Sequence, residues 1–229
     1  MKNLLIVIPV YNEQENIESV ISEWENLNID VEFDILIIND GSKDETPIIL
    51  ERLKNKYKNL YIINKENSGH GNAIIDGYKY SVEKKYNFTF QVDGDSQFSS
   101  SDFKKIWNYR HKVDLVSGNR ENRNDPIIRI LLSKIFLRAL LLILFLKYLK
   151  DPNVPFRLIN NNFLSEFLKV CEKQNLAPNI LMSLYAKKII FIEVKHYTRK
   201  TGEINWKLRK LFVFGVKLIV EIISFWKKI

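Results

Sequence analysis

Cysteine is almost absent from this chain of 229 residues, which contains only Cys171. One cysteine excludes an internal disulfide and a zinc site built from several cysteine thiolates. Such usage is typical of a reducing compartment, where disulfides are rare. A chain of this length can bury a full hydrophobic core without covalent cross-links. We therefore expect a globular, cytoplasmic protein.

Long hydrophobic runs are also missing. The longest uncharged apolar stretch, residues 139–146, has eight residues, whereas a membrane-spanning helix needs about 20. The apolar residues 4–10 are too few for a secretory leader and run directly into polar residues 11–13. The sequence therefore predicts neither a transmembrane helix nor a leader peptide.

Acidic residues are scarce in two segments of a chain whose net charge is +8. Residues 127–150 contain five lysines and arginines and no acid, and residues 195–229 contain nine against two. Both segments are also rich in large apolar residues, a combination that favours an anionic membrane surface over nucleic acid. The alternative is that both segments form core helices whose lysines face solvent.

The first half of the chain alternates strand patterns with helical patterns. Strands are predicted at residues 4–9, 33–39, 60–64, 88–92 and 114–118, and helices at 13–24, 46–57, 71–84 and 101–109. This order predicts an α/β fold with a mostly parallel sheet flanked by helices on both faces.

The second half is dominated by amphipathic helical patterns. Helices are expected at residues 127–149, 161–172, 178–187 and 206–228, with a strand at 189–194. Lys217 and Glu221 stand four residues apart within the last helix, which favours lying along a bilayer over crossing it. We therefore expect a main domain over residues 1–203 and a C-terminal amphipathic helix over 204–229, which associates with a membrane or packs on the domain.

Two carboxylates directly follow the fourth predicted strand, in the sequence Asp93-Gly-Asp95. Two ionised carboxylates would repel each other in a dry pocket, and a divalent cation resolves that repulsion. Oxygen ligands of this kind suit Mg²⁺ or Mn²⁺, and Gln97 could supply another oxygen. The alternative is an Asp-Gly turn that caps a helix. Ligands of open parallel sheets bind at the carboxyl ends of the strands, which favours the metal site.

Other polar groups follow the remaining predicted strands. Asp40 comes after the second strand, where it can accept hydrogen bonds from a base or ribose or can form an Asx-turn. Gly69 and Gly71 precede a helix and allow the backbone to approach a ligand closely. His70 between them is equally compatible with a solvent-exposed loop.

Seven short motifs follow one another between residues 9 and 202: PVYNE, NDGSKDET, NSGHGNAIIDGY, DGDSQF, SGNR, DPNVPFRL and HYTRKTG. In this order they resemble the family 2 glycosyltransferases, which have the Rossmann-like GT-A fold. More narrowly, the chain is similar to the polyprenol-phosphate sugar transferases, such as the dolichol-phosphate mannose synthases. His70 departs from this pattern, because a lysine is frequent at its position.

The resemblance implies a nucleotide-sugar donor and a role for each matching residue. The donor would lie near Pro9, Tyr11, Glu13, Asp40 and Gly71, and Asp93, Asp95 and Gln97 would hold the metal at its diphosphate. Arg120 and Arg199 match arginines that contact phosphates, and Arg157 would lie near the donor sugar or the loop over it. A metal ion and arginines would stabilise the charge that develops on the departing nucleoside diphosphate.

The acceptor is the least determined part of the reaction. Arg129 and Ser133 are four residues apart on one predicted helix face, so both can meet one phosphate, and the resemblance implies this contact with a lipid phosphate. A phosphate needs no general base because it is already anionic, whereas a sugar hydroxyl does need one. Asp151 is the candidate base, with ligand binding and helix capping as its alternatives.

These observations predict an inverting, metal-dependent glycosyltransferase at the inner face of a membrane. It would move a hexose from a GDP- or UDP-sugar to a polyprenyl phosphate, with Asp95, Asp151 and Arg199 as catalytic residues. One alternative is transfer to a hydroxyl of a growing surface glycan. Another is a non-catalytic nucleotide-sugar-binding or membrane-interaction protein. Nucleic acid is not expected as a partner, because no reader motif is present.

Overall fold

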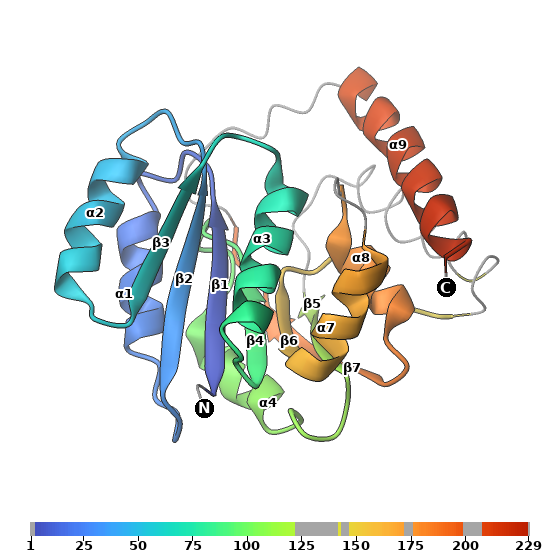
Figure 1. Ribbon diagram of the computed structural model, residues 1–229, viewed down its shortest axis with the longest axis horizontal. Coiled ribbons are helices and arrows are strands. Elements are labelled where there is room, and N and C mark those ends of the chain that lie inside the picture. The colour runs from blue at the N-terminus through green and yellow to red at the C-terminus, as the bar shows by residue number, and fades with distance from the viewer. Residues whose placement is uncertain (1–2, 122–141, 143–146, 172–175, 199–207, 229) are drawn as a thin grey trace.

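The computed structural model describes residues 3–121, 142, 147–171, 176–198 and 208–228 (Figure 1). These residues form a seven-stranded sheet with the order β3-β2-β1-β4-β6-β5-β7. Its strands are β1 (Leu4–Val10), β2 (Phe33–Asp40), β3 (Leu60–Lys65), β4 (Phe88–Val92), β5 (Leu115–Glu121), β6 (Phe156–Asn160) and β7 (Ile189–Lys195). Only β6 runs against its neighbours in this sheet. The predicted α/β fold with a mostly parallel sheet is therefore confirmed.

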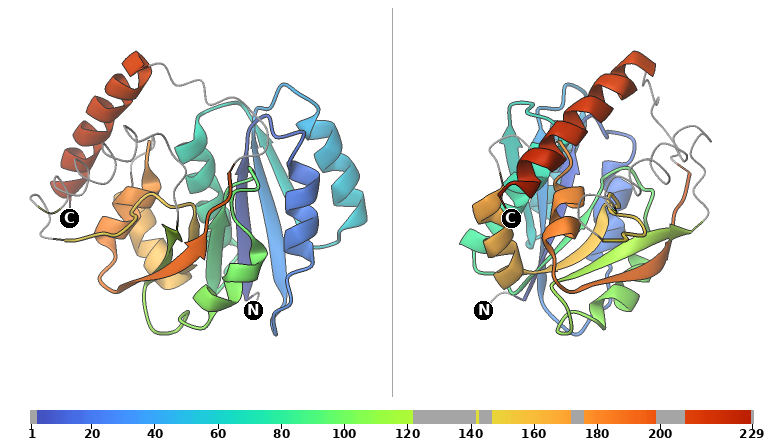
Figure 2. Two further views of the ribbon diagram at one scale, coloured as in Figure 1. Left: turned by 180° about the vertical axis from the view of Figure 1, so that it is seen from behind. Right: turned by 90° about the vertical axis from the view of Figure 1, so that its right-hand side faces the viewer.

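Helices cover both faces of the sheet (Figure 2). One layer contains α1 (Ile17–Glu25), α2 (Thr46–Lys56) and α4 (Phe103–Trp107), the last preceded by a 3₁₀ turn at Ser100–Asp102. The opposite layer contains α3 (His70–Glu83), α7 (Asn161–Val170) and α8 (Pro178–Tyr185). Because both faces are covered, the central strand β1 is buried along all seven of its residues.

Helix α3 packs against β1 without room for a side chain at Gly77. A Cβ atom at this position would lie 2.2 Å from Cγ1 of Val7. This close approach brings the amino-terminal end of α3 to the sheet edge at which β1 and β2 end.

The element boundaries differ from the sequence predictions in two instructive places. The strand β6 was not predicted, because Arg157 and Asn160 leave only three apolar residues in its five. The first helix begins at Ile17 and not at residue 13, because the Glu13 carbonyl accepts hydrogen bonds from the N–H groups of Asn16 and Ile17 in a preceding turn. Most of the helix predicted over 127–149 lies outside the described residues.

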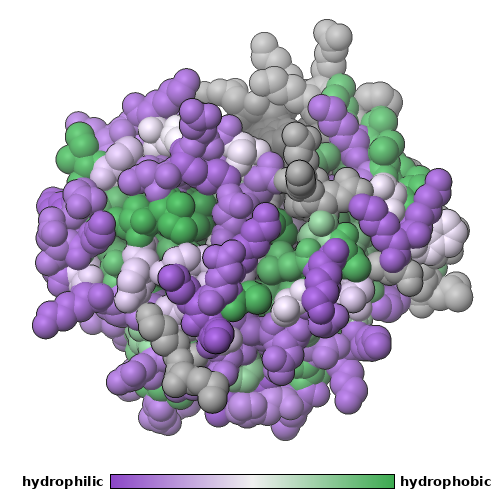
Figure 3. Space-filling model, viewed as in Figure 1, coloured by the Kyte–Doolittle hydropathy of each residue, from purple (hydrophilic) through white to green (hydrophobic). Residues whose placement is uncertain are grey.

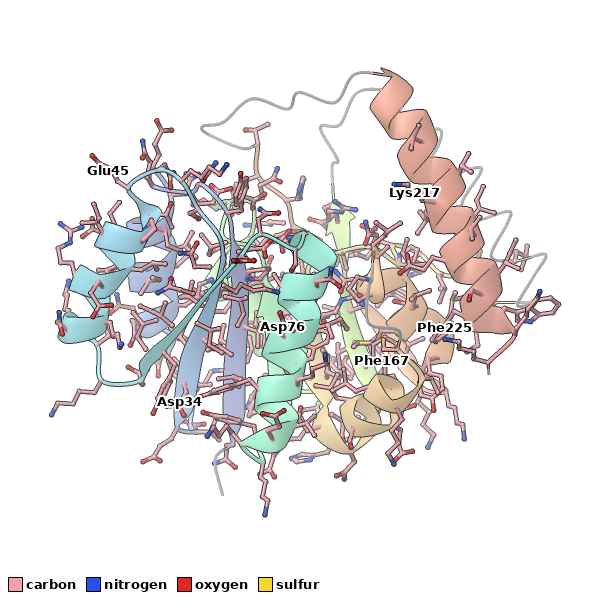
Figure 4. The ribbon with its side chains drawn as sticks, turned by 45° about the horizontal axis from the view of Figure 1, so that its top comes forward. Asp34, Glu45, Asp76, Phe167, Lys217 and Phe225 are labelled. Atoms are coloured by element: carbon pink, nitrogen blue, oxygen red, sulfur yellow. The ribbon has the colours of Figure 1, made fainter. Side chains whose placement is uncertain are left out.

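The last helix, α9 (Leu208–Trp226), contacts the domain through its carboxyl-terminal half. Ile222 and Phe225 are buried, and the Phe225 ring lies 6.2 Å from the ring of Phe167 and 6.3 Å from that of Tyr185 (Figure 4). None of the helices in the described part of the chain combines the length and apolar character that crossing a bilayer requires.

Candidate active site

The loops that follow β1 and β2 are joined at the sheet edge where the parallel strands end (Figure 1). The Asn12 N–H donates to Oγ of Ser42 at 3.0 Å, and the Lys43 N–H donates to Oδ1 of Asn12 at 2.8 Å. Asn12 has a φ of +54°, in the left-handed region that asparagine tolerates better than most residues. These contacts fix the PVYNE segment against the loop that follows β2.

Within this segment, the three residues predicted to bind the donor have different surroundings. Pro9 is buried in β1, and Tyr11 exposes 45% of its surface just after the end of that strand. Glu13 is buried, its N–H donates to Oγ1 of Thr46 at 2.9 Å, and its Oε2 accepts from Asn16 at 2.7 Å. Of the three, Tyr11 therefore has the side chain most accessible to a ligand.

Asp40 is buried at the end of β2, and its carboxylate holds the loop that precedes α3. Oδ1 accepts from the Ser68 N–H and Oδ2 from the Gly69 N–H, both at 2.9 Å. The amine of Lys65 lies 3.9 Å from Oδ1. Both oxygens are thus engaged by the chain itself, and Asp40 positions the adjacent residues His70 and Gly71 at the start of α3.

Asp93 follows β4 and presents a buried carboxylate oxygen, Oδ1, that has no hydrogen-bond partner among the described residues. His70 Nε2 lies 3.5 Å from this oxygen. Burial, with Asp95 adding a like charge, raises the pKa of Asp93 to about 6, while His70 acts in the opposite direction. A carboxylate held in this way is ready to accept a cation.

The adjacent turn, residues 95–97, is anchored to the segment that follows β7. Oδ1 of Asp95 accepts from the Gln97 N–H at 3.2 Å. The Gln97 side-chain amide donates to the Tyr197 carbonyl at 3.2 Å, and the Tyr197 N–H donates to the Gln97 carbonyl at 3.0 Å. Since the amide nitrogen of Gln97 is used, its amide oxygen is the atom able to bind a cation.

The residues of this turn fit a divalent ion such as Mg²⁺ or Mn²⁺. The unpartnered Oδ1 of Asp93 and the nearby carboxylate of Asp95 are the hard oxygen ligands that these ions prefer. The described residues contain no group of three or more histidine, cysteine or acidic side chains that could hold a metal. Two carboxylates alone would leave positions open for phosphate oxygens and water, as Mg²⁺ sites commonly do.

Arg120 and Asp151 form an ion pair with two parallel hydrogen bonds. Nε of Arg120 lies 2.7 Å from Oδ2 of Asp151, and Nη2 lies 2.9 Å from Oδ1. The two side chains are only 12% and 7% exposed. The predicted phosphate ligand and the predicted base are therefore partners of each other.

Arg157 is fully buried and binds backbone carbonyls. Its guanidinium donates to the carbonyl oxygens of Pro152, Val154 and Asn179 at distances between 2.7 and 3.1 Å. Burial lowers the pKa of Arg157 to about 10, so it stays charged at neutral pH. Its partners are thus residues 152 and 154 of the preceding loop and Asn179 of α8, and its place near the donor sugar or the loop over it stays a prediction.

Tyr78 is a buried polar residue of α3 that the sequence analysis missed. Its hydroxyl donates to Oε1 of Gln91 at 2.7 Å and lies 3.5 Å from Oδ1 of Asn179. Gln91 pairs with Arg157 across β4 and β6. The tyrosine fits the apolar face of its helix, so only the polar Gln91 inside the buried strand β4 could have signalled this network.

The predicted site residues thus divide into three groups. The first, placed at the carboxyl edge of the sheet, contains Pro9, Tyr11, Glu13, Asp40, Gly71, Asp93, Asp95, Gln97, Arg120 and Asp151. Arg157 lies beneath the neighbouring loop. Arg129, Ser133 and Arg199 lie outside the described residues.

Comparison with known proteins identifies the family. Residues 5–169 match the family described as glycosyl transferase family 2. The chain belongs to this family. This glycosyltransferase is also 32% identical over 174 residues to an uncharacterised protein of Methanocaldococcus jannaschii, with 71% of the chain and 74% of that protein covered.

Two further relatives carry more specific names. The glycosyltransferase is 28% identical to the putative glycosyltransferase CsbB of Bacillus subtilis, over 94% of its own length and 65% of that protein. It is 27% identical to the undecaprenyl-phosphate 4-deoxy-4-formamido-L-arabinose transferase of Pectobacterium atrosepticum, over 92% of its length and 64% of that protein. The chain therefore spans slightly less than two thirds of both relatives.

Solved structures share the GT-A-like fold of this glycosyltransferase. Glucosyl-3-phosphoglycerate synthase of Mycobacterium tuberculosis, in complex with phosphoglyceric acid, superposes with a TM-score of 0.72 at 16% identity, covering 98% of this chain and 80% of that one. TarS of S. aureus, in complex with UDP-GlcNAc, superposes with a TM-score of 0.63 at 20% identity, covering 97% and 67%. At these identities the likeness concerns the fold.

Proposed function

We propose that this family 2 glycosyltransferase is an inverting, metal-dependent enzyme that transfers a hexose from a GDP- or UDP-sugar to a polyprenyl phosphate. The observation that carries the proposal is the buried Oδ1 of Asp93, which accepts no hydrogen bond from the described residues and lies beside the carboxylate of Asp95. A buried carboxylate oxygen without a hydrogen bond at the end of a strand indicates a ligand that completes it.

Asp93 and Asp95 would hold the metal ion, and the amide oxygen of Gln97 could join them. When bound there, a divalent cation supplies positive charge to the diphosphate of the leaving nucleotide. A structural neighbour, glucosyl-3-phosphoglycerate synthase, has been crystallised with Mn²⁺ and UDP-glucose. This supports a nucleotide-sugar donor and a metal of the same kind here.

The donor would lie along the carboxyl edge of the sheet. Tyr11 is exposed there and offers its ring to a base, with Pro9 and Glu13 shaping the same loop. Asp40 and Gly71 would contribute through the backbone that they position before α3. Arg120 would direct its charge to the phosphates, and Arg199 is proposed to do the same from the HYTRKTG motif.

A phosphate acceptor agrees best with the state of Asp151. Both oxygens of this carboxylate are bound by Arg120, and the side chain is 7% exposed. In this arrangement Asp151 is poorly placed to deprotonate a sugar hydroxyl, whereas an anionic phosphate needs no base. Relatives named undecaprenyl-phosphate transferases support the same acceptor, and Arg129 and Ser133 are its proposed ligands. We place the reaction at the inner face of the membrane.

Transfer to a glycan hydroxyl is the second candidate. It requires Asp151 to leave Arg120, for example when Arg120 turns toward a donor phosphate. Asp151 would then be available as the base. The variant Asp151→Asn separates the two acceptors, because transfer to a hydroxyl needs the carboxylate as a base and transfer to an anionic phosphate does not.

The direct test is a donor screen. Full-length protein is incubated with Mn²⁺, radiolabelled UDP- or GDP-sugars and undecaprenyl phosphate in detergent, and labelled lipid is extracted into organic solvent. We expect metal-dependent labelling that is lost in Asp93→Asn and kept in Asp30→Asn, whose side chain is exposed and distant from the turn. Labelling that is insensitive to Asp93→Asn would contradict the metal role, and no labelled lipid with any donor would contradict the acceptor.

A further inference from the structure

Helix α9 has a second apolar face, opposite the one that packs on the domain. Its inward face includes Ile222 and Phe225, which are buried. Its outward face carries Val213, Val216, Val220 and Ile223, each between 36% and 62% exposed. We call these four residues the outer stripe.

The spacing of the outer stripe makes it continuous along the helix. Val213, Val216, Val220 and Ile223 follow one another at intervals of three and four residues, which places them in one line on a helix surface. Figure 3 shows hydrophobic surface along α9 with hydrophilic side chains beside it. An exposed apolar line of this length is typical of an interaction surface.

The charges around the outer stripe are basic. Lys217 is exposed on the helix (Figure 4), and Lys227 and Lys228 are exposed where it ends. The only acid of the helix, Glu221, accepts a hydrogen bond from the Leu176 N–H through Oε1. The apolar side chains are therefore bordered by positive charge, which is complementary to an anionic lipid surface.

The position of α9 agrees with a role near the active site. Its amino-terminal end lies at the same end of the molecule as the carboxyl ends of β1, β2 and β3 (Figures 1 and 2). The amino-terminal end of α9 is therefore at the end of the molecule where the Asp93–Asp95 turn is located. This is where a lipid-borne phosphate would have to arrive.

We propose that the outer stripe of α9 binds an anionic bilayer and holds the active site against it. The purpose of this contact rests on the proposed lipid-phosphate acceptor, although bilayer binding itself can be measured without catalysis. The predicted division into a domain, residues 1–203, and a terminal helix, residues 204–229, is part of the proposal. A second copy of the chain is the less favourable occupant, because pairing two stripes would bring their lysines together.

The test measures partition of the full-length protein onto vesicles by flotation. Vesicles of phosphatidylcholine are compared with vesicles that also contain phosphatidylglycerol, and neither contains polyprenyl phosphate. We expect binding to the anionic vesicles that weakens with salt. The double variant Val216→Gln and Val220→Gln should bind about tenfold less.

A matched control and a charge variant complete the design. Ile48→Gln removes an apolar side chain that is 73% exposed on α2, at the opposite side of the molecule, and should bind like the wild type. Changing Lys217, Lys227 and Lys228 to glutamine should weaken binding to anionic vesicles about fivefold per lysine. Glutamine is a better helix former than valine, so the double variant should keep its helix, which circular dichroism verifies.

Three results would overturn the proposal. They are absence of wild-type binding to anionic vesicles, equal binding of the wild type and the double variant, and a wild-type dimer in light scattering that the double variant lacks. Failure of the proposed function is detected separately, as absence of transfer to polyprenyl phosphate in detergent, where no bilayer is needed.

Discussion

Arg120 and Asp151 hold each other in a two-pronged ion pair across 31 residues of chain, with both side chains largely buried. The pair joins β5 to the loop before β6. It also joins two residues with different predicted roles: Arg120 as a ligand of the donor phosphates and Asp151 as a general base. Two directed hydrogen bonds fix the guanidinium plane, which a lysine could not reproduce.

The first prediction concerns the coupling of this pair. Asp151→Asn should destabilise the fold by about 3 kcal/mol, because a buried guanidinium loses its counter-charge. Asp151→Asn combined with Arg120→Gln should cost less than the sum of the single changes. Urea unfolding of the wild type, the two single variants and the double variant gives the coupling energy. Strictly additive losses of unfolding free energy would contradict coupling between the two side chains.

The second prediction separates stability from ligand binding at the acidic turn. Asp93→Asn should leave the unliganded protein as stable as the wild type or more stable, because it removes a buried charge whose Oδ1 accepts no hydrogen bond from the described residues. The same change should abolish metal-dependent donor binding. Thermal unfolding without ligand and calorimetric titration of UDP or GDP with Mn²⁺ measure the two effects.

Asp102 provides the matched control for Asp93. It is also buried, but its carboxylate accepts from the Lys195 N–H at 2.7 Å and pairs with Lys105 at 2.8 Å. Asp102→Asn should therefore destabilise the fold by about 1–3 kcal/mol and leave donor binding intact. If both variants lost stability equally and kept donor binding, Asp93 would be a structural residue.

The sequence could predict which residues lie at the carboxyl edge of the sheet, but not which partners each of their side chains binds. The acidic turn at Asp93 and Asp95 follows from a buried strand that ends in carboxylates, and the strand pattern places it correctly. The engagement of Asp40 by the Ser68 and Gly69 N–H groups could not be predicted, because it depends on where a loop 28 residues away returns.

Arg157 shows the second limit. The resemblance implies a place for this arginine near the donor sugar or the loop over it, and the sequence does not show that its side chain is buried. Here the partners are carbonyls of the same loop and of α8. Backbone acceptors exist at every residue, so a sequence pattern does not reveal which of them a side chain will meet.

The third prediction concerns the network around Tyr78. Tyr78→Phe should cost about 1–2 kcal/mol of unfolding free energy, because Oε1 of buried Gln91 loses its 2.7 Å donor. Tyr57→Phe, at a partly buried tyrosine outside this network, should change stability little. Chemical denaturation of both variants measures the difference, and equal effects would show that the Tyr78 hydroxyl is not important to the network.

The fourth prediction is a pH dependence at Glu25, far from the acidic turn. Burial, with the nearby Asp34 carboxylate, raises the pKa of Glu25 above its ordinary value of 4.5, while Asn59 acts in the opposite direction. Within the described part of the chain, the buried Oε1 of Glu25 has no hydrogen-bond partner. A raised pKa in the folded state means that the protonated form favours folding. This contribution is complete below pH 4.5 and is lost as the pH rises through the folded-state pKa.

Glu25→Gln should therefore raise the urea midpoint at pH 8 and have little effect at about pH 4, where Glu25 is already largely protonated in the fold. The amide has nearly the shape of the protonated acid, so packing is preserved. Glu51→Gln, at an exposed position of α2, should leave the midpoint unchanged at both values. A midpoint shift for Glu25→Gln that is the same at both pH values would instead assign the effect to packing, since only the charged form of Glu25 is penalised by burial.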